Sequence, residues 1–376
     1  MHIGSLLKSG LAVALLWATT GMAFAVSCTY DSGRVATVGA MPLQVTAITV
    51  GRDVPVGTEV YRQTFSMASG QAARLDCRFA PYQMFTEMTV DAGSGLANWN
   101  SGVYAGKVYN AGIAGLGVAF NSSGGPLPRQ TNKVATTCTA GNRCLVPMDG
   151  PSNFELILIK IGDVAPGVLT GSSLPTVSLY GNFGDARMLG FKMGISGSLQ
   201  IVSRTCSTPD VSVPMGTHTP KEFTGANTAT AWTNFSIRLN NCPAFNGTVS
   251  KSPASWVVSQ GGNPPSGSGG SGSRESNSLR YRIDPVRTAI NSGTGVLSLD
   301  PTAAGRPAAA SGIGVQIAFM TGTQPFPLAV LQSSGLTLSS SESSYTIPLR
   351  ARYLQTASTV KGGPANASAT FTISYD

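Results

Sequence analysis

One stretch of the sequence gathers side chains of the kinds that bind sugars. Residues 91–110, DAGSGLANWNSGVYAGKVYN, have the Gly/Ser content of a loop and contain Asp91, Asn98, Trp99, Asn100, Tyr104 and Tyr109. Aromatic faces pack against the apolar C–H patches of a sugar, and Asp and Asn side chains hydrogen-bond to its hydroxyls. We interpret the first five as candidate ligand-binding residues. The alternative is that Trp99 and the tyrosines pack in the core.

Six cysteines could form disulfides or bind a metal: Cys28, Cys77, Cys138, Cys144, Cys206 and Cys242. An even number in an exported chain favours disulfides, for which 15 pairings exist. Sequential pairing, 28–77, 138–144 and 206–242, fits the segmentation of the chain best. A zinc site is disfavoured because the chain has no C-x-x-C motif and His218 is the only histidine after residue 25, so we predict no metal or cofactor. The loop TCTAGNRCL (137–145) would present Asn142 and Arg143, and we interpret it as a structural staple.

Side chains suited to catalysis are scarce. With the cysteines paired and one histidine available, neither a Ser-His-Asp nor a Cys-His arrangement can be assembled. Glu87 and Asp91 could act as a carboxylate pair on a glycoside, but nothing distinguishes them from other carboxylates. The formal net charge of +8 is spread along the chain without a dense basic run containing aromatics, so nucleic-acid binding is not expected. We predict that the protein is not an enzyme.

The elements that must position these residues are β-strands. Short runs of Val, Thr, Ile and Leu alternate with turn residues among 45 Gly and 23 Pro, which favours an all-β chain of two β-sandwich domains. Residues 1–25, with Lys8, the apolar LAVALLWA and a small-residue cleavage site, are typical of a secretory signal peptide. The alternating GSLQIVS (197–203) predicts a last strand, and hence domains at 26–203 and 204–376. The Gly/Ser-rich segment 261–276 is expected to be a flexible surface loop.

The second half has the clearer strand pattern. Predicted strands are CSTPDVSVPMGTH (206–218), WTNFSIRLNNC (232–242), 279–284, 295–300, 313–320, 345–356 and the terminal NASATFTISYD (366–376). The first has Val211, Val213 and Met215 on one face. The last alternates so that Phe371, Ile373 and Tyr375 share a face, which is typical of a half-buried strand. No later element follows to cover its other edge.

Several of these segments closely resemble the pilin domain of chaperone–usher fimbriae: TCSTPDVSVPMG, FSIRLNNCP, GIGVQI and YTIPLRARYLQTASTVKGGPANASATFTISY. A glycine fourteenth from the end and a penultimate tyrosine are that family's terminal signature, here Gly363 and Tyr375. The resemblance implies an incomplete immunoglobulin-like sandwich that lacks its last strand. A periplasmic chaperone lends a strand, and at the outer-membrane usher the next pilin subunit replaces it by donor-strand exchange. Phe371, Ile373 and Tyr375 would then line one wall of the acceptor groove.

The first half is similar, more loosely, to the N-terminal receptor-binding domain of two-domain fimbrial tip adhesins. The similarity lies in SCTYDSG, VPVGTEVYRQTF (54–65), Cys77, FELILIKIGDVAPG and GSSLPTVSLYGN. Only Val26 and Ser27 precede Cys28 after the expected cleavage, so we expect no donor strand and a place at the fimbrial tip. The resemblance implies an adhesin exported through the periplasm to the cell surface, with a glycan or glycoprotein receptor. The alternative is a non-adhesive tip or initiator pilin.

Overall fold

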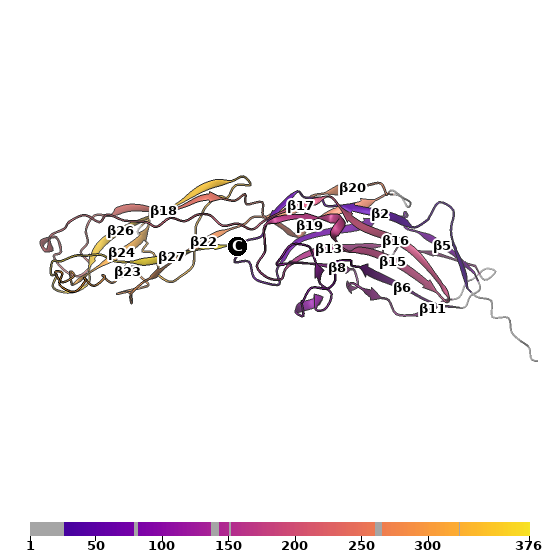
Figure 1. Ribbon diagram of the computed structural model, residues 1–376, viewed down its shortest axis with the longest axis horizontal. Coiled ribbons are helices and arrows are strands. Elements are labelled where there is room, and N and C mark those ends of the chain that lie inside the picture. The colour runs from indigo at the N-terminus through magenta and orange to yellow at the C-terminus, as the bar shows by residue number, and fades with distance from the viewer. Residues whose placement is uncertain (1–25, 79–81, 137–142, 150–151, 260–264, 323) are drawn as a thin grey trace, which may run out of the picture.

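The fold is all-β, as the sequence predicts. The computed structural model describes residues 26–78, 82–136, 143–149, 152–259, 265–322 and 324–376, and the predicted signal peptide lies outside them. Two β-rich halves lie end to end in an elongated molecule (Figure 1). Helix in the described residues is confined to three short 3-10 turns, η1 (Gly102–Tyr104), η2 (Gly171–Ser173) and η3 (Pro220–Glu222). None of the helices described is long and apolar enough to cross a membrane.

Two large sheets form the first half. The first sheet contains, in spatial order, β10 (Arg129–Gln130), β6 (Tyr82–Asp91), β15 (Thr176–Phe183), β16 (Ala186–Ser196) and β2 (Thr37–Pro42), with β11 (Val134–Thr136) also paired to β6. The second contains β20 (Gly267–Gly270), β19 (Thr248–Val258), β4 (Glu59–Met67), β13 (Asn153–Lys160), β8 (Leu116–Ser122) and β7 (Tyr109–Asn110), with β21 (Ser273–Glu275) on β19 and β9 (Gly125–Pro126) on β8.

Smaller sheets close the two ends of this half. One is β1 (Ser27–Tyr30), β5 (Arg74–Arg78) and β12 (Arg143–Pro147), and the other is β14 (Gly167–Thr170), β17 (Ser198–Val202) and β3 (Ala47–Thr49). The large sheets pack face to face as a sandwich, and aromatic side chains from both sheets meet between them. Phe191 of β16 has its ring centroid 5.2 Å from that of Phe65 in β4 and 5.9 Å from that of Phe154 in β13.

Strand β13, NFELILIK, is apolar on both faces, and both faces are buried. Leu156 and Leu158 point into the main core between the two sheets. Ile157 and Ile159 point the other way and pack in a satellite cluster with Tyr104, Val108 and Ala119. A strand that is covered on both sides reads as a continuous apolar run, which is why this segment lacks simple alternation.

The second half has its own core between two sheets. One sheet is β18 (Thr233–Cys242), β26 (Ser343–Gln355), β24 (Ile313–Phe319) and β23 (Val296–Leu297), and the other is β25 (Gln332–Ser333), β22 (Leu279–Pro285) and β27 (Ala369–Tyr375). These strands coincide with most of the runs predicted in this half. Alternation places Ile237 and Leu239 of β18 in the core, and the same period buries Ile373 and Tyr375 of β27.

The strand predicted over residues 206–218 is wrong. Apart from a single bridge between Ser207 and Asn240, this segment pairs with no strand among the described residues. Val211 and Met215 still pack against the core. Pro209 and Pro214 lack the N–H group that a ladder needs, and the segment runs beside a groove instead of beside a strand.

The expectation of a flexible loop over residues 261–276 is also wrong where the structure describes it. Strand β20 pairs antiparallel with β19 over Ser255–Val258, and β21 pairs with β19 as well. Strand β19 in turn runs parallel to β4 of the first half. The glycines allow close approach, because a Cβ at Gly267 would collide with the Trp256 ring and one at Gly269 with the Gln44 side chain. The second half of the sequence therefore supplies strands to the first sandwich.

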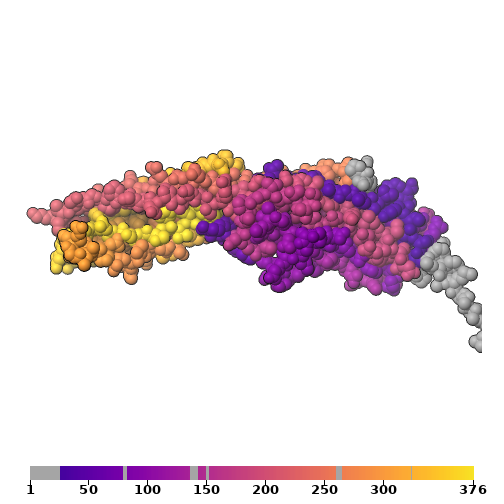
Figure 2. Space-filling view, viewed as in Figure 1, coloured from indigo at the N-terminus to yellow at the C-terminus, as the bar shows by residue number. Residues whose placement is uncertain are grey.

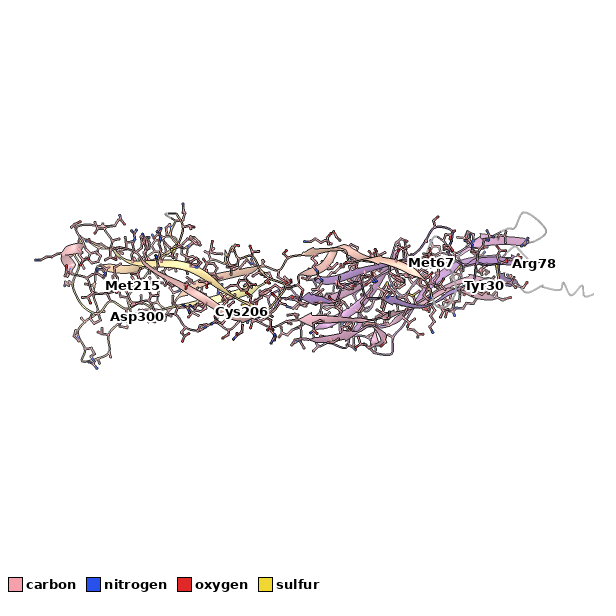
Figure 3. All side chains as sticks on the ribbon, turned by 90° about the horizontal axis from the view of Figure 1, so that it is seen from above. Tyr30, Met67, Arg78, Cys206, Met215 and Asp300 are labelled. Carbon is pink, nitrogen blue, oxygen red and sulfur yellow. A yellow bond between two sulfur atoms is a disulfide. The ribbon has the colours of Figure 1, made fainter. Side chains whose placement is uncertain are left out.

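Two of the predicted disulfides, Cys28–Cys77 and Cys206–Cys242, are present. Cys144 is also disulfide-bonded, and Cys138, its predicted partner, lies outside the described residues. Cys28 and Cys144 lie opposite Cys77 on either side, in the neighbouring strands β1 and β12. The Cys28–Cys77 bond therefore links β1 to β5 in the small sheet β1–β5–β12, at the end of the first half where Figure 3 labels Tyr30 and Arg78.

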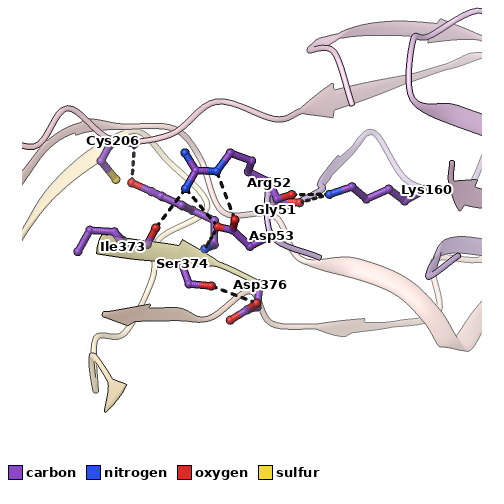
Figure 4. A network of polar contacts seen from close by, with 9 residues as sticks. Gly51, Arg52, Asp53, Lys160, Cys206, Ile373, Ser374 and Asp376 are labelled. Carbon is purple, nitrogen blue, oxygen red and sulfur yellow. Dashed lines mark hydrogen bonds and ion pairs between the residues drawn. The ribbon is translucent and has the colours of Figure 1, made fainter. Parts of the chain in front are cut away.

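The two halves meet at a junction held by the C-terminal strand (Figure 4). Asp53 and Tyr375 exchange two hydrogen bonds: the Asp53 N–H donates to the Tyr375 carbonyl at 3.0 Å, and the Tyr375 N–H donates to Asp53 Oδ2 at 2.9 Å. The Tyr375 hydroxyl accepts from the Cys206 N–H at 2.9 Å. On the other side, Lys160 Nζ donates to the carbonyls of Gly51 and Arg52. Lys160 is buried, which lowers its pKa.

Candidate functional site

The structure brings two of the five predicted ligand-binding residues to one pocket. Trp99 and Tyr104 line it, whereas Asp91 lies exposed at the end of β6 and Asn98 and Asn100 point to solvent. The loop that carries these residues projects from the side of the first half, beside β8 (Figure 1). Tyr109, in β7, is buried in the main core.

The pocket has a volume of about 440 Å³ and combines apolar rims with a polar wall. Val103 and Val56 form exposed rims, with 75% and 57% of their surface accessible. The remaining lining residues are Gly57, Glu59, Trp99, Ser101, Gly102, Tyr104 and Ile159. This size lies in the range of small-molecule sites, and the mixture of aromatic, apolar and acidic groups suits a ligand with both hydroxyls and C–H faces.

Trp99 is half-buried and contacts two parts of the structure. Its ring packs against the satellite cluster of Ile157 and Ile159, and it also lies against Gly57 at the pocket wall. Its indole Nε1 is buried, and no described residue accepts a hydrogen bond from it. Trp99 therefore belongs neither to the main core nor to open solvent.

A chain of charged and polar groups supports the pocket wall. The Tyr104 hydroxyl donates to Glu59 Oε1 at 3.5 Å, and Arg62 bridges Glu59 and Glu155 at 2.5 and 2.9 Å. Asn121 Nδ2 donates to Glu155 Oε2 at 3.2 Å. Burial, together with the charge of Glu59, raises the pKa of Tyr104 to about 12, so this hydroxyl stays protonated. Glu59 is held in place by Arg62 and still presents oxygens to the pocket.

Sequence reasoning missed Glu59, Arg62 and Val56. All three lie in the stretch VPVGTEVYRQTF, which was singled out for its resemblance and not for its chemistry. Two charged residues three apart in a strand whose Tyr61 and Phe65 are buried were the available signal. Simple alternation would place Glu59 on the side of the buried Tyr61 and Phe65. The pairing of β4 with β13 shifts register between Tyr61 and Glu59, and this irregularity lets Glu59 face the same way as Arg62.

A second concave surface is a groove in the other half, with a volume of about 600 Å³. One wall is the unpaired segment Asp210–Gly216, and the other is Ala365–Ala369 with Phe371. The floor is apolar and consists mainly of Phe235, Ile237, Ile283, Leu297, Val315, Ile317 and Tyr353. Figure 2 shows a hollow between the salmon-coloured segment and the yellow C-terminal strands. Figure 3 labels Met215, which lines the groove, in the half away from Tyr30.

Phe371, Ile373 and Tyr375 share a face of β27 but have different surroundings. Phe371 lines the groove and is partly exposed. Ile373 and Tyr375 are buried and are not among the residues that line it, and Tyr375 lies at the junction. Gly363 marks a close approach, because a Cβ there would collide with the Ala308 carbonyl.

The remaining candidates take structural roles where they are described. Asn142 lies outside the described residues. Arg143 donates from Nε to Asp76 Oδ1 at 2.9 Å, and this hydrogen bond lowers the pKa of Asp76. Glu87 pairs with Arg187 at 2.6 Å. His218 contacts Glu222 at 2.9 Å.

Comparison with known proteins confirms the resemblance to fimbrial adhesins. Residues 193–376 match the model of the fimbrial protein family, "Fimbrial protein". A fimbria adhesin protein of Klebsiella pneumoniae is 26% identical over 334 residues, which cover 88% of each chain. Among solved structures, the CupB6 tip adhesin of Pseudomonas aeruginosa is 15% identical, with a TM-score of 0.34 over 93% of this chain and 95% of its own. The receptor binding domain of the adhesin MrkD1P of Klebsiella pneumoniae is 20% identical, with a TM-score of 0.34 over 48% of this chain and 98% of its own.

Proposed function

We propose that this chain, which carries a fimbrial protein domain at residues 193–376 and is similar to a fimbria adhesin along most of its length, is the tip adhesin of a chaperone–usher fimbria. Its first half binds a receptor on a surface. Its second half accepts a donor strand, which attaches it to the fimbria.

Attachment to the fimbria through a donor strand is supported by the groove, which has unpaired backbone on both walls. Strand β27 is bonded to β22 along one edge, and no described strand pairs with its other edge. The opposite wall, Asp210–Gly216, is likewise unpaired. An added strand would pair with these exposed backbone N–H and C=O groups, and its alternating apolar side chains would cover the apolar floor. A periplasmic chaperone, then the next pilin subunit at the usher, would supply that strand in turn.

Fusing a donor strand after Asp376 tests this attachment. The chain ends beside the groove-lining strand, so a short linker allows an alternating apolar segment to turn back along β27. We expect the unfused mature chain to aggregate and the fused chain to be monomeric and to unfold cooperatively. A fused segment of the same length with Asp at its apolar positions is the matched control and should give no rescue. An unfused chain that is already monomeric and cooperatively stable would refute the proposal.

The receptor is a glycan or glycoprotein, and the pocket of Trp99, Tyr104 and Glu59 is its site. Trp99 and Tyr104 supply aromatic surface, and Glu59 can accept hydrogen bonds from hydroxyls. The exposed Val56 and Val103 offer apolar contact at the rim, where nothing in the described structure covers them.

A glycan array probed with the donor-strand-fused chain tests the receptor. The full chain is required, because β19 belongs to the first sandwich. Val103→Ser should weaken binding to any glycan that the array identifies, without lowering the melting temperature, because the side chain is exposed. Val168→Ser is the matched control, 55% exposed and outside the pocket. Equal binding by both variants would refute this pocket. A chain that binds neither the array nor host glycoproteins would be the non-adhesive tip subunit.

A further inference from the structure

The outer face of the sheet β18–β26–β24 is cationic and has no acidic side chain. The sequences of these three strands contain Arg238, Arg350 and Arg352 and no Asp or Glu. Phe235, Ile237 and Leu239 of β18 point inward, so Trp232 and Arg238, at the opposite parity, lie on the outer face. On β26, Ile347, Leu349 and Ala351 are buried, which puts Arg350 and Arg352 on the same outer face. We call Trp232, Arg238, Arg350 and Arg352 the basic face.

Two arginines of the basic face converge on one aromatic ring. The guanidinium carbons of Arg350 and Arg352 lie 4.5 and 4.1 Å from the centre of the Trp232 ring. Cation–π contact of this kind fixes the guanidinium groups on the sheet. The ring thereby holds two like charges side by side.

Neither arginine has a counter-ion among the described residues. The Arg350 side chain donates to one acceptor, the backbone carbonyl of Gly322, and the Arg352 side chain donates to one, Gln316 Oε1 at 2.9 Å. A guanidinium has five N–H groups, and each of these two arginines donates only from one nitrogen to an acceptor in the described structure. The Arg350 Nε is buried without an acceptor in the described structure. Burial, and then the charge of Arg350, lower the pKa of Arg352, as expected where like charges meet without a carboxylate.

The three arginines lie in a row along the outer face, with Arg238 exposed and Arg350 and Arg352 partly exposed. Arg350 and Arg352 are two residues apart on β26, about 7 Å by strand geometry. Arg238 lies opposite Thr346, four residues from Arg350, or about 14 Å along the sheet. A single small anion can meet only part of such a row, whereas a polymer with repeated anionic groups can meet all of it.

We propose that the basic face binds an acidic polysaccharide through its sulfate or carboxylate groups. Strand β26, which carries two of the arginines, is central in its sheet. Its backbone is already paired, so it presents charge and not a strand edge. This favours a ligand recognised by its anions over a peptide that adds as a strand. The site lies on the second half, on different elements from the Trp99 pocket, and does not depend on that pocket.

Binding of the donor-strand-fused mature chain to immobilised heparin, with neutral dextran as the reference surface, tests the proposal. We expect heparin binding at about 0.15 M salt that weakens steeply as salt is added. Arg350→Gln/Arg352→Gln should reduce affinity about tenfold or more and flatten the salt dependence by about two lost contacts. Arg287→Gln/Arg306→Gln is the matched control, because it removes the same charge from exposed positions of the same half. The control should change affinity less than about twofold.

A second variant keeps the test independent of folding. Arg238 is exposed, so Arg238→Gln should leave the melting temperature unchanged and still weaken heparin binding about threefold, with Arg287→Gln as its control. Absence of heparin binding by the wild-type chain would overturn the proposal. So would equal losses in the control variants, or an unchanged affinity in Arg238→Gln. Poly-glutamate binding that equals heparin binding, with the same arginine dependence, would assign the face to an acidic polypeptide and also overturn it.

Discussion

Removing residues 248–258 is expected to destabilise the first half of the molecule, although they come from the second half of the sequence. This segment is β19, which runs parallel to β4. Val249, Ala254 and Val258 have no accessible surface, and Val249 and Val258 belong to the main core of the first half. Without β19, β4 would become an open edge and those core contacts would be lost.

The expected loss is large relative to the stability of a domain. Full burial of a valine side chain contributes about 1.5–3 kcal/mol, and a methyl-sized group about 0.8 kcal/mol. The three buried side chains together therefore contribute about 4–7 kcal/mol to the free energy of unfolding. Domains of this kind are stable by about 5–15 kcal/mol in total. At about 2–4 °C per kcal/mol, the melting temperature should fall by about 8–28 °C.

Thermal unfolding of three proteins tests this prediction. They are the donor-strand-fused full mature chain, residues 26–203 alone, and residues 26–203 joined through a flexible linker to residues 245–278. We expect the isolated 26–203 fragment to melt far below the full chain or to show no cooperative transition, and the linked segment to restore it. A monomeric 26–203 fragment that melts within about 3 °C of the full chain would refute the reasoning.

A point variant reports on the same contact within the full chain. Val258→Ala removes two buried methyl groups and should cost about 2 kcal/mol, counting the cavity left behind. Val168→Ala is the matched control on the surface of the first half and should change stability by no more than about 0.5 kcal/mol. Equal melting temperatures for the two variants would show that β19 is not part of the first core.

Phe371→Asp should abolish co-purification with the assembly chaperone, because a strand added to the groove would bury the unpaired charge at a cost of several kcal/mol. Thr372→Asp, on the exposed face of β27, should not, and equal capture of both variants would contradict the groove assignment. Burial raises the pKa of Glu275, but hydrogen bonds from β19 outweigh it and lower the pKa to about 2. The stability that the ionised Glu275 contributes above about pH 4.5 should therefore be lost as the pH falls toward 2. Glu275→Gln should flatten that loss in acid-unfolding curves, and an unchanged curve would count against it. Non-reducing peptide mapping should link Cys138 to Cys144, and a bond from either to residues 204–376 would disprove the pairing.

The parts of the fold that could be predicted from sequence are those decided by local alternation. Strands β18 and β27 each have a buried and an exposed face, so a period of two marks them plainly. Residues 206–218 show the same alternation, yet their neighbour is a groove, and alternation alone does not supply a pairing partner. The Gly/Ser segment reads as flexible because its composition carries no side chains to pack. Its strands depend on Trp256 and on Gln44, a residue more distant in the sequence, whose positions only the fold sets.

The candidate site shows a similar division. Residue type was enough to single out Trp99 and Tyr104, because a loop rich in aromatics and amides is a conspicuous composition. Asp91, Asn98 and Asn100 share the loop but not the pocket, since a loop orients successive side chains in different directions. Glu59 completes the wall from a strand about 40 residues earlier, and sequence spacing gives no sign that the two segments meet.

The route of the chain across the junction has a mechanical consequence. The backbone passes between the halves three times, from β17 toward Cys206, from β18 to β19, and from β21 to β22. A tensile force along the long axis is therefore shared by three covalent crossings and the hydrogen bonds of Tyr375. Two domains joined by one linker would have a single covalent crossing. Strand β19 runs roughly along that axis in Figure 1, and β4 is paired parallel to it, so such a force shears their hydrogen bonds together instead of opening them one by one. The halves should resist both swinging and extension when the molecule is pulled from its two ends.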